Sequence, residues 1–207
     1  MSELFDIYDE ALNHIGVKPR AAAHRDGDWH QVFHCWVIGR ERDRSPFLVL
    51  QKRKADLDYP NKIDISAAGH LAAGESPRDG PREIREELGL CVAFEDLIPL
   101  GRRVGINKIG DFVDRQICHV FLSQCNQPLE AYNYQRDEVA GLIKLPIADA
   151  MRLHAGEVPF VVAPAVGLES PQITLTLDDF IPSIDNYIMK FLLLAQRYFA
   201  GEKELWI

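Results

Sequence analysis

The residues best suited to chemistry are three glutamates in one short charged segment, Glu83, Glu86 and Glu87. In a helix, spacings of three and four residues would bring all three carboxylates onto about 100° of one face. Glu83 and Glu87 would then be like charges at i and i+4, which costs roughly 0.2–0.5 kcal/mol. Carboxylate oxygens suit Mg²⁺ and Mn²⁺, ions that also bind phosphate oxygens. The helix alone therefore leaves two interpretations open, a solvated acidic helix face and a divalent-metal site.

A fixed spacing links this helix to the loop before it. Gly69 is followed after five residues by Glu75, and residues 82–90 then read REIREELGL. This pattern resembles the Nudix box, G-x5-E-x7-R-E-U-x-E-E-x-G-U, in which U is an aliphatic residue. Here only six residues separate Glu75 from Arg82, and the difference falls in the loop before the helix. The spacing within residues 82–90 is intact, so we expect the metal-binding face to be retained.

The resemblance implies a role for each fixed residue of the box at 69–90. The residues that match the family's metal-binding carboxylates are Glu83, Glu86 and Glu87. The Gly69 carbonyl matches a backbone ligand, and Arg82 would hold the carboxylates in place. Glu75 is expected to brace the loop rather than bind metal. The implied reaction is attack of water on a diphosphate linkage, with Mg²⁺ or Mn²⁺ neutralising the developing charge.

A further carboxylate from a later loop often completes such sites. Glu138 stands just before a strand-like segment and is the candidate general base. A solvated loop acid is an equally good interpretation of Glu138, and the sequence leaves both open. The expected catalytic set is then Glu83, Glu86, Glu138 and Arg82.

A second resemblance extends beyond the box and covers roughly residues 3–150. Residues 18–20, 24–30 and 65–70 look like the Nudix branch related to isopentenyl-diphosphate isomerase, which binds a metal through three histidines and two glutamates. The residues that match its histidines are His24, His30 and His70. Asp114 and Gln116 fall where the two glutamates would be. The histidines are therefore either a second metal site or core residues with satisfied hydrogen bonds.

The isomerase chemistry itself is disfavoured. Moving a double bond requires one group to protonate a carbon and another to deprotonate one. The position of the isomerase's catalytic cysteine is Ala68 here, and Gln116 is neutral, so this pair is broken. Because the box glutamates are intact, the sequence favours a hydrolase over an isomerase-like enzyme or a non-catalytic diphosphate-binding protein.

The elements that position these residues follow from hydrophobic periodicity and turn residues. Strands are expected at 4–8, 14–18, 31–38, 47–51, 63–67, 97–104, 112–122 and 139–145, and helices at 81–88, 147–154 and about 183–200. This order favours an α+β fold over repeated βαβ units. The resemblance implies a Nudix-type α/β/α sandwich with a mixed central sheet, formed by a single domain over 1–207. The two additions are an N-terminal hairpin at about 3–20 and the long C-terminal helix.

The composition and net charge indicate which kinds of partner and cellular environment suit the protein. The 207 residues are 47% hydrophobic and 26% charged, as in folded globular proteins. The net charge of −8 argues against nucleic acid as the main partner. The longest apolar run near the C-terminus, at 191–195, is too short to span a bilayer. Four cysteines without a CxxC pair indicate reduced thiols and a cytoplasmic protein.

The expected partner is a small-molecule diphosphate, either a nucleoside diphosphate derivative or an isoprenoid diphosphate. Trp29, Trp36 and Tyr59 suit stacking on a base or lining an isoprenoid pocket, and the sequence does not choose between these uses. Because the terminal hairpin and helix lie outside the box, a homodimer built on them is also expected.

Overall fold

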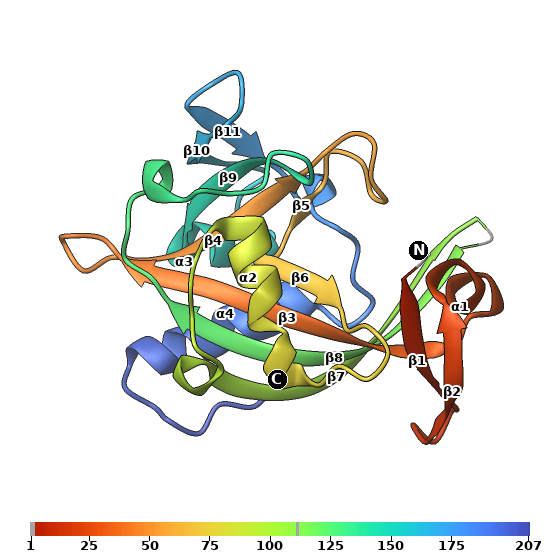
Figure 1. The fold of residues 1–207 in the computed structure, drawn as a ribbon. Helices are drawn as coiled ribbons and strands as arrows, with labels where there is room; N and C mark the ends of the chain where they lie inside the picture. The colour runs from red at the N-terminus through yellow and green to blue at the C-terminus, as the bar shows by residue number, and fades with distance from the viewer. Residues whose placement is uncertain (1–2, 111) are drawn as a thin grey trace.

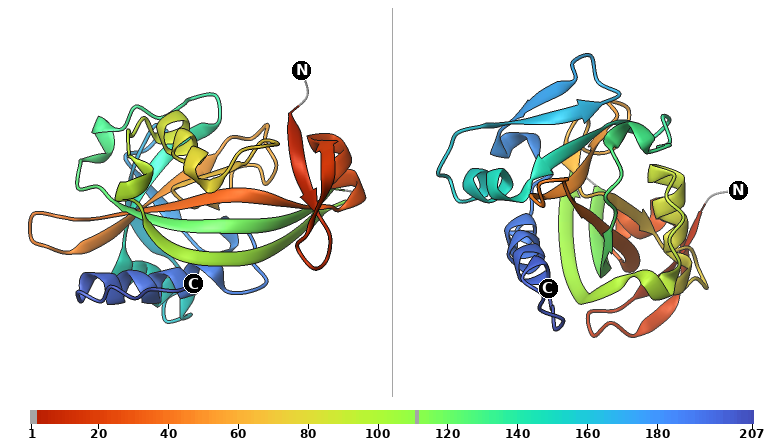
Figure 2. Two further views of the ribbon diagram at one scale, coloured as in Figure 1. Left: turned by 60° about the horizontal axis from the view of Figure 1, so that its bottom comes forward. Right: turned by 90° about the vertical axis from the view of Figure 1, so that its left-hand side faces the viewer.

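The computed structural model describes residues 3–110 and 112–207. A large mixed sheet lies between helices on its two faces (Figure 1, Figure 2). Its strands are β1 Leu4–Tyr8, β2 His14–Pro19, β3 Trp29–Arg40, β4 Pro46–Arg53, β5 Ile63–Asp64, β6 Ala67–His70, β7 Ile98–Ile109, β8 Phe112–Gln124, β9 Val139–Pro146, β10 Val161–Val166 and β11 Gln172–Leu175. The α-helices are α1 Arg20–Asp26, α2 Pro81–Leu88, α3 Ile147–His154 and α4 Tyr187–Phe199. The predicted α+β sandwich with a mixed central sheet is confirmed.

Strand β3 is the centre of the sheet. It pairs in parallel with β8 and antiparallel with β4 and β6. Successive side chains of a strand point to opposite faces, so β3 contributes to two cores. Phe33 faces α2 and joins a cluster with Ile84, whereas Trp36 faces the other side and its ring stacks on Phe191 of α4 at 4.0 Å. The helices α2 and α4 are therefore held on opposite faces by alternate residues of one strand.

The N-terminal hairpin and α1 form a lobe at one end of the sheet, on the right in Figure 1. Strands β1 and β2 pair antiparallel from Leu4 opposite Pro19, so the predicted hairpin is confirmed. The lobe joins the sheet where Ile7 pairs with His30. Phe5, Ile7 and Ala23 form a small separate core between the hairpin and α1.

Several elements differ from their predicted form. The single strand predicted at 63–67 is divided into β5 and β6, because residues 63–64 pair with β4 whereas residues 67–70 pair with β3. The terminal helix begins at Tyr187 rather than near 183, after Asn186 with its left-handed φ of 53°. Helix α1 and the hairpin of β10 and β11 were not predicted.

Helix α2 has the predicted bounds, and two glycines define its ends. Gly89 follows the helix with a φ of 69°, and its N–H donates to the Arg85 carbonyl at 3.0 Å. Gly80 precedes the helix, and a Cβ there would lie 2.0 Å from the Phe33 ring. The first turn of α2 therefore packs on β3 at a distance that only glycine permits.

In the part of the chain that the structure describes, no helix combines the length and the apolar character needed to cross a membrane.

We predict that Gly80→Ala destabilises the protein. The backbone at Gly80 has a φ of −57°, which alanine adopts freely, so the cost comes only from the contact with Phe33. Overpacking of this kind costs about 1–3 kcal/mol of unfolding free energy. Urea unfolding monitored by circular dichroism measures the change.

Gly105→Ala is the matched control, because Gly105 is also buried and a Cβ there meets no atom closer than 3.4 Å. Its expected effect is within about 1 kcal/mol of zero. Equal losses in the two variants would show that the contact with Phe33 is not the cause.

Candidate active site

The three glutamates of α2 differ in their exposure to solvent. Glu83 and Glu87 are buried, and Glu86 is exposed. The Arg82 guanidinium links two of them, because Nη2 lies 2.9 Å from Glu83 Oε1 and Nη1 lies 3.1 Å from Glu86 Oε2. Arg82 thus lies beside the carboxylates, where the sequence placed it.

Glu75 lies in the loop before α2 and contacts the same arginine. Its Oε2 lies 3.4 Å from Arg82 Nη2 and accepts the Ala72 N–H at 2.8 Å. Both contacts tie the loop to itself and to the helix, which is the geometry of a brace.

Glu87 is the most enclosed of the acids. Its Oε2 accepts the Ala68 N–H at 2.9 Å and the Gln51 side-chain amide at 3.1 Å. Burial raises the pKa of Glu87 well above its usual range. Burial also raises the pKa of Glu83 to about 7, against the opposing effect of Arg82. For both carboxyl groups, the nearby positive charge does not offset the free-energy cost of burying the ionised form.

Two further residues of the predicted site lie against this pair. The Gly69 backbone runs under Glu83, and a Cβ at position 69 would lie 2.0 Å from Glu83 Cδ. Glu138 is exposed, and its charge is close enough to raise the pKa of both Glu83 and Glu87. The fold therefore assembles the box residues and Glu138 in one region.

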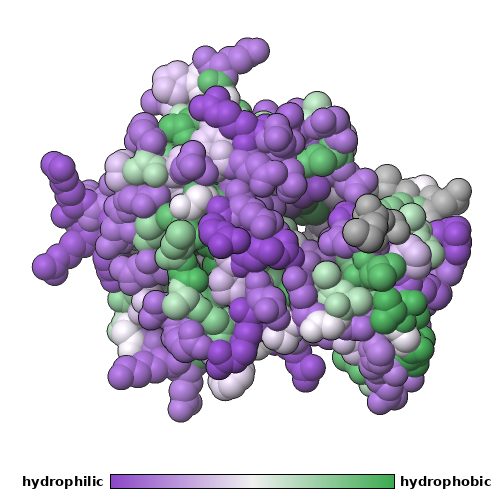
Figure 3. Space-filling model, viewed as in Figure 1, coloured by the Kyte–Doolittle hydropathy of each residue, from purple (hydrophilic) through white to green (hydrophobic). Residues whose placement is uncertain are grey.

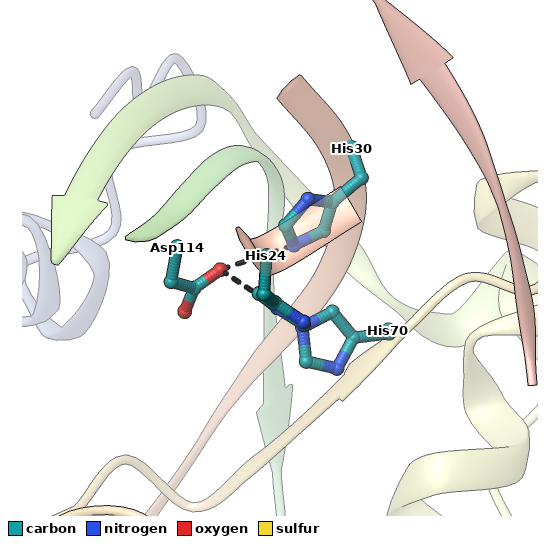
Figure 4. Close-up of side chains that lie close together, drawn as sticks. All are labelled: His24, His30, His70 and Asp114. Carbon is teal, nitrogen blue, oxygen red and sulfur yellow. Dashed lines mark ion pairs between the residues drawn. The ribbon is translucent and has the colours of Figure 1, made fainter. Parts of the chain in front are cut away.

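The second predicted site is more tightly gathered (Figure 4). His24 comes from α1, His30 from β3, His70 from β6 and Asp114 from β8. One nitrogen or oxygen of each lies within 4.8 Å of those of the others. Over residues 3–110 and 112–207, no other group of three or more histidine, cysteine or acidic side chains has its ligand atoms this close together. The glutamates of α2 do not form such a group.

Hydrogen bonds define the protonation of two of these histidines. His24 Nδ1 donates to the Arg20 carbonyl and His30 Nδ1 donates to the Asp28 carbonyl, both at 3.0 Å. The Nε2 atom of each ring is then the one directed to the centre of the cluster. The two Nε2 atoms lie 3.5 and 3.0 Å from Asp114 Oδ1. Lone pairs facing a buried carboxylate repel unless a cation, either a proton or a metal ion, lies among them.

The donor set fits a metal ion. The Nε2 atoms of all three histidines are buried, without a hydrogen-bond partner among the described residues. Histidines that ligate metals commonly donate their other ring N–H to a backbone carbonyl, as His24 and His30 do here. Three imidazoles and one carboxylate are ligands that suit Zn²⁺ and other first-row transition ions.

Aromatic rings close this cluster. Phe5 of the hairpin stacks on His30 and His70 with centroids 5.0 and 4.8 Å apart, and Phe112 stacks on His24 at 4.3 Å. The N-terminal lobe thus supplies one histidine and one wall of the site. Gln116 lies beside the cluster, and its side-chain N–H donates to Asp114 Oδ2 at 2.7 Å.

A cavity of about 150 Å³ lies beside the histidine cluster and reaches the backbone of β6 that contacts the glutamates, although no box glutamate lines it. His70 and Asp114 line it, and so do Ala68 and Gly69, whose other contacts are with Glu87 and Glu83. Residues that the sequence did not single out for the site also line the cavity: His34, Asn107, Ile181, Ser183 and Tyr187. These residues are up to 153 positions apart in the chain, so no local spacing in the sequence marks them as neighbours.

The comparisons with known proteins agree with the box. The chain matches no family model. It is 40% identical over 192 residues to an uncharacterized Nudix hydrolase of Clostridium acetobutylicum, which covers 89% of this chain and 93% of that protein. The chain therefore belongs to the Nudix hydrolase family.

A solved structure and an isomerase are also similar to it. The crystal structure of DR0079 from Deinococcus radiodurans matches 74% of this chain and 90% of its own at a TM-score of 0.54 and 20% identity, which supports the fold. The isopentenyl-diphosphate isomerase of Agromyces mediolanus is 30% identical over 126 residues, 59% of either protein. The isomerase-like branch is thus a weaker match than the family.

Proposed function

We propose that this Nudix protein hydrolyses a diphosphate linkage in a small phosphorylated metabolite and requires a divalent metal ion. The observation that carries the proposal is the pair of buried carboxyl groups, Glu83 and Glu87, against the cavity-lining backbone at Gly69 and Ala68. Burial without enough positive charge disfavours their ionised forms, and a bound cation would reverse that. Family membership supports the same reaction.

The proposed roles follow from position. The ligands for Mg²⁺ or Mn²⁺ are Gly69, Glu83, Glu86 and Glu87. When bound, the ion would neutralise charge on the phosphate oxygens and lower the pKa of water. Arg82 and Glu75 position the carboxylates and the loop, and Glu138 is the proposed general base. Arg20 and Arg53 line the cavity and would orient an anionic diphosphate.

The histidine cluster is proposed as a second metal site, formed by His24, His30, His70 and Asp114. Its fixed Nδ1–H tautomers and its uncompensated lone pairs support this use. His70 and Asp114 of the cluster line the cavity, so a metal ion held there would also act on an anionic substrate in the cavity.

We also propose that the described residues form one domain and that the protein is a cytoplasmic homodimer. One connected sheet from β2 to β11 supports the single domain. Leu4, Ile15 and Val17 of the hairpin are 45–54% exposed, and Figure 3 shows apolar surface over the hairpin on the right. Four free cysteines agree with a reducing compartment.

We predict that hydrolysis requires the box glutamates and a metal ion. Phosphate release from a panel of nucleoside and isoprenoid diphosphates with Mg²⁺ or Mn²⁺ identifies the best substrate. On that substrate, Glu86→Gln should lower kcat by at least about 100-fold, because each 1.4 kcal/mol of lost charge stabilisation lowers the rate tenfold. The fold should remain, since Glu86 is exposed.

Glu95→Gln is the control, because Glu95 is an exposed acid that pairs with Arg78 away from the cavity. It should retain full activity. Undiminished turnover by the Glu86 variant, or by the wild type in EDTA, would contradict the proposal.

A second prediction separates the hydrolase from an isomerase. Isopentenyl diphosphate with Mg²⁺ should not yield its allylic isomer, because Ala68 lines the cavity without an ionisable group and the Gln116 amide is bonded to Asp114. Ala68→Cys should not restore isomerisation, since the second acid–base group is still missing. Proton NMR of the products measures this, and allylic product at an enzymatic rate would overturn the assignment.

A third prediction concerns the histidine cluster. Cobalt(II) should bind with visible absorption bands typical of mixed nitrogen and oxygen ligands. His30→Asn should weaken binding by about 100-fold or more, at least as much as the loss of an outer-shell partner does. His14→Asn, which changes an exposed histidine, is the control. Equal Co²⁺ affinity of the two variants would show that the cluster is not the binding site.

A further inference from the structure

His34 lies in the cavity but outside the histidine cluster. It is on β3, directly opposite Ala68 of β6, so the two side chains share the cavity face of the sheet. Its side chain is 7% exposed. Neither the box nor the cluster accounts for a buried imidazole at this position.

A chain of two hydrogen bonds defines where the His34 proton lies. Trp36 Nε1 lies 2.9 Å from the Tyr187 hydroxyl oxygen, and an indole N–H can only donate. The Tyr187 hydroxyl proton is therefore free to donate to its other neighbour, His34 Nδ1, at 3.1 Å. When Nδ1 accepts, the proton of the neutral ring is on Nε2. This is the opposite tautomer to that of His24 and His30.

The partner in this chain is itself held in place. Arg103 lies over the Tyr187 ring at 4.1 Å and forms two hydrogen bonds with Asp185, at 2.9 and 3.2 Å. Burial raises the pKa of Tyr187 well above its ordinary value, so the hydroxyl keeps its proton. Burial, assisted by the Arg103 charge, lowers the pKa of His34 to about 3, so its ring is neutral near pH 7.

The other ring nitrogen, His34 Nε2, takes no part in the bond to Tyr187, and His34 lines the cavity. The cavity lining is partly apolar, with Ile65 and Ile188, and partly polar, with Arg103 and Asn107. A neutral N–H donor held in such surroundings discriminates strongly, because a ligand without an acceptor leaves the donor unpaired.

We infer that His34 determines substrate specificity by donating its Nε2–H to an acceptor on the organic group of the diphosphate. The substrate then carries a carbonyl, hydroxyl or ring nitrogen near the phosphates, and a plain hydrocarbon chain is rejected. The part about substrate rests on the proposed hydrolase function, whereas the tautomer of His34 does not.

The first test determines the tautomer of His34 and does not depend on enzymatic activity. Long-range ¹H–¹⁵N NMR of the histidine rings at neutral pH should show His34 protonated on Nε2 and His24 and His30 on Nδ1, all in one spectrum. A spectrum of His34→Gln identifies the His34 signals. Tyr187→Phe should mix the two His34 tautomers. An Nδ1–H tautomer, or titration near the ordinary pKa of 6.5, would overturn the inference.

The second test measures the substrate preference of the wild type and of His34 variants. We expect wild type with Mg²⁺ to favour ADP over isopentenyl diphosphate in kcat/KM. His34→Phe should lower kcat/KM for ADP at least tenfold, mainly through KM, and leave inorganic pyrophosphate unchanged. His34→Gln, which keeps an N–H donor, should recover part of the loss. Equal losses on all three compounds, or an unchanged preference, would contradict the role of His34.

The two proposals fail separately. If wild type hydrolyses none of these compounds, the hydrolase proposal fails, and binding still tests His34. Addition of ADP should then shift the His34 Nε2–H resonance, whereas inorganic pyrophosphate should not. Absence of a shift at saturating ADP, judged from other cavity resonances, would overturn the inference.

Discussion

The structure of the site depends on the burial of two carboxyl groups against one short strand. Strand β6 is four residues long and pairs with β3 on one side. Glu87 of α2 accepts the Ala68 N–H, and Glu83 occupies the space that the missing side chain of Gly69 leaves. Helix α2 can bury these acids only because it starts on Gly80, in contact with Phe33 of β3. The bracing arginine, the loop and the cavity wall all follow from that placement.

Because successive residues of a strand point to opposite faces, β6 contributes to two different surfaces. Gly69 lies against the glutamates, whereas Ala68 and His70 share the cavity face with His34. A strand of four residues thus has the glutamates against one face and forms a wall of the cavity with the other. In an isomerase-like arrangement the Ala68 position would supply a thiol to this space. Here the wall is chemically inert at that point, and the polar groups that face the cavity belong to its neighbours.

The sequence predicted the parts of the structure that local rules determine. Helix α2 was placed at its observed bounds because Pro81 and Gly89 are strong start and stop signals, and α3 follows Pro146 in the same way. The histidines were identified only through resemblance, and the short fourth ligand, Asp114, was noted as a position and not as part of a cluster. No spacing rule connects His34 with Tyr187, which lies 153 residues later. The division of β5 from β6 depends on their pairing with two different strands, β4 and β3, which are distant contacts.

The N-terminal lobe is tied to the rest of the molecule through the histidine cluster. His24 reaches the cluster only because α1 docks beside β8, and Phe5 stacks on two of the other rings. Without a cation, the lone pairs of His24 and His30 oppose the Asp114 carboxylate in the contact that joins lobe and sheet. A cation bound there would convert repulsion into shared ligation, so its binding free energy would also stabilise the docking of the lobe. Binding of a cation at the proposed site and docking of the N-terminal lobe would therefore be thermodynamically linked.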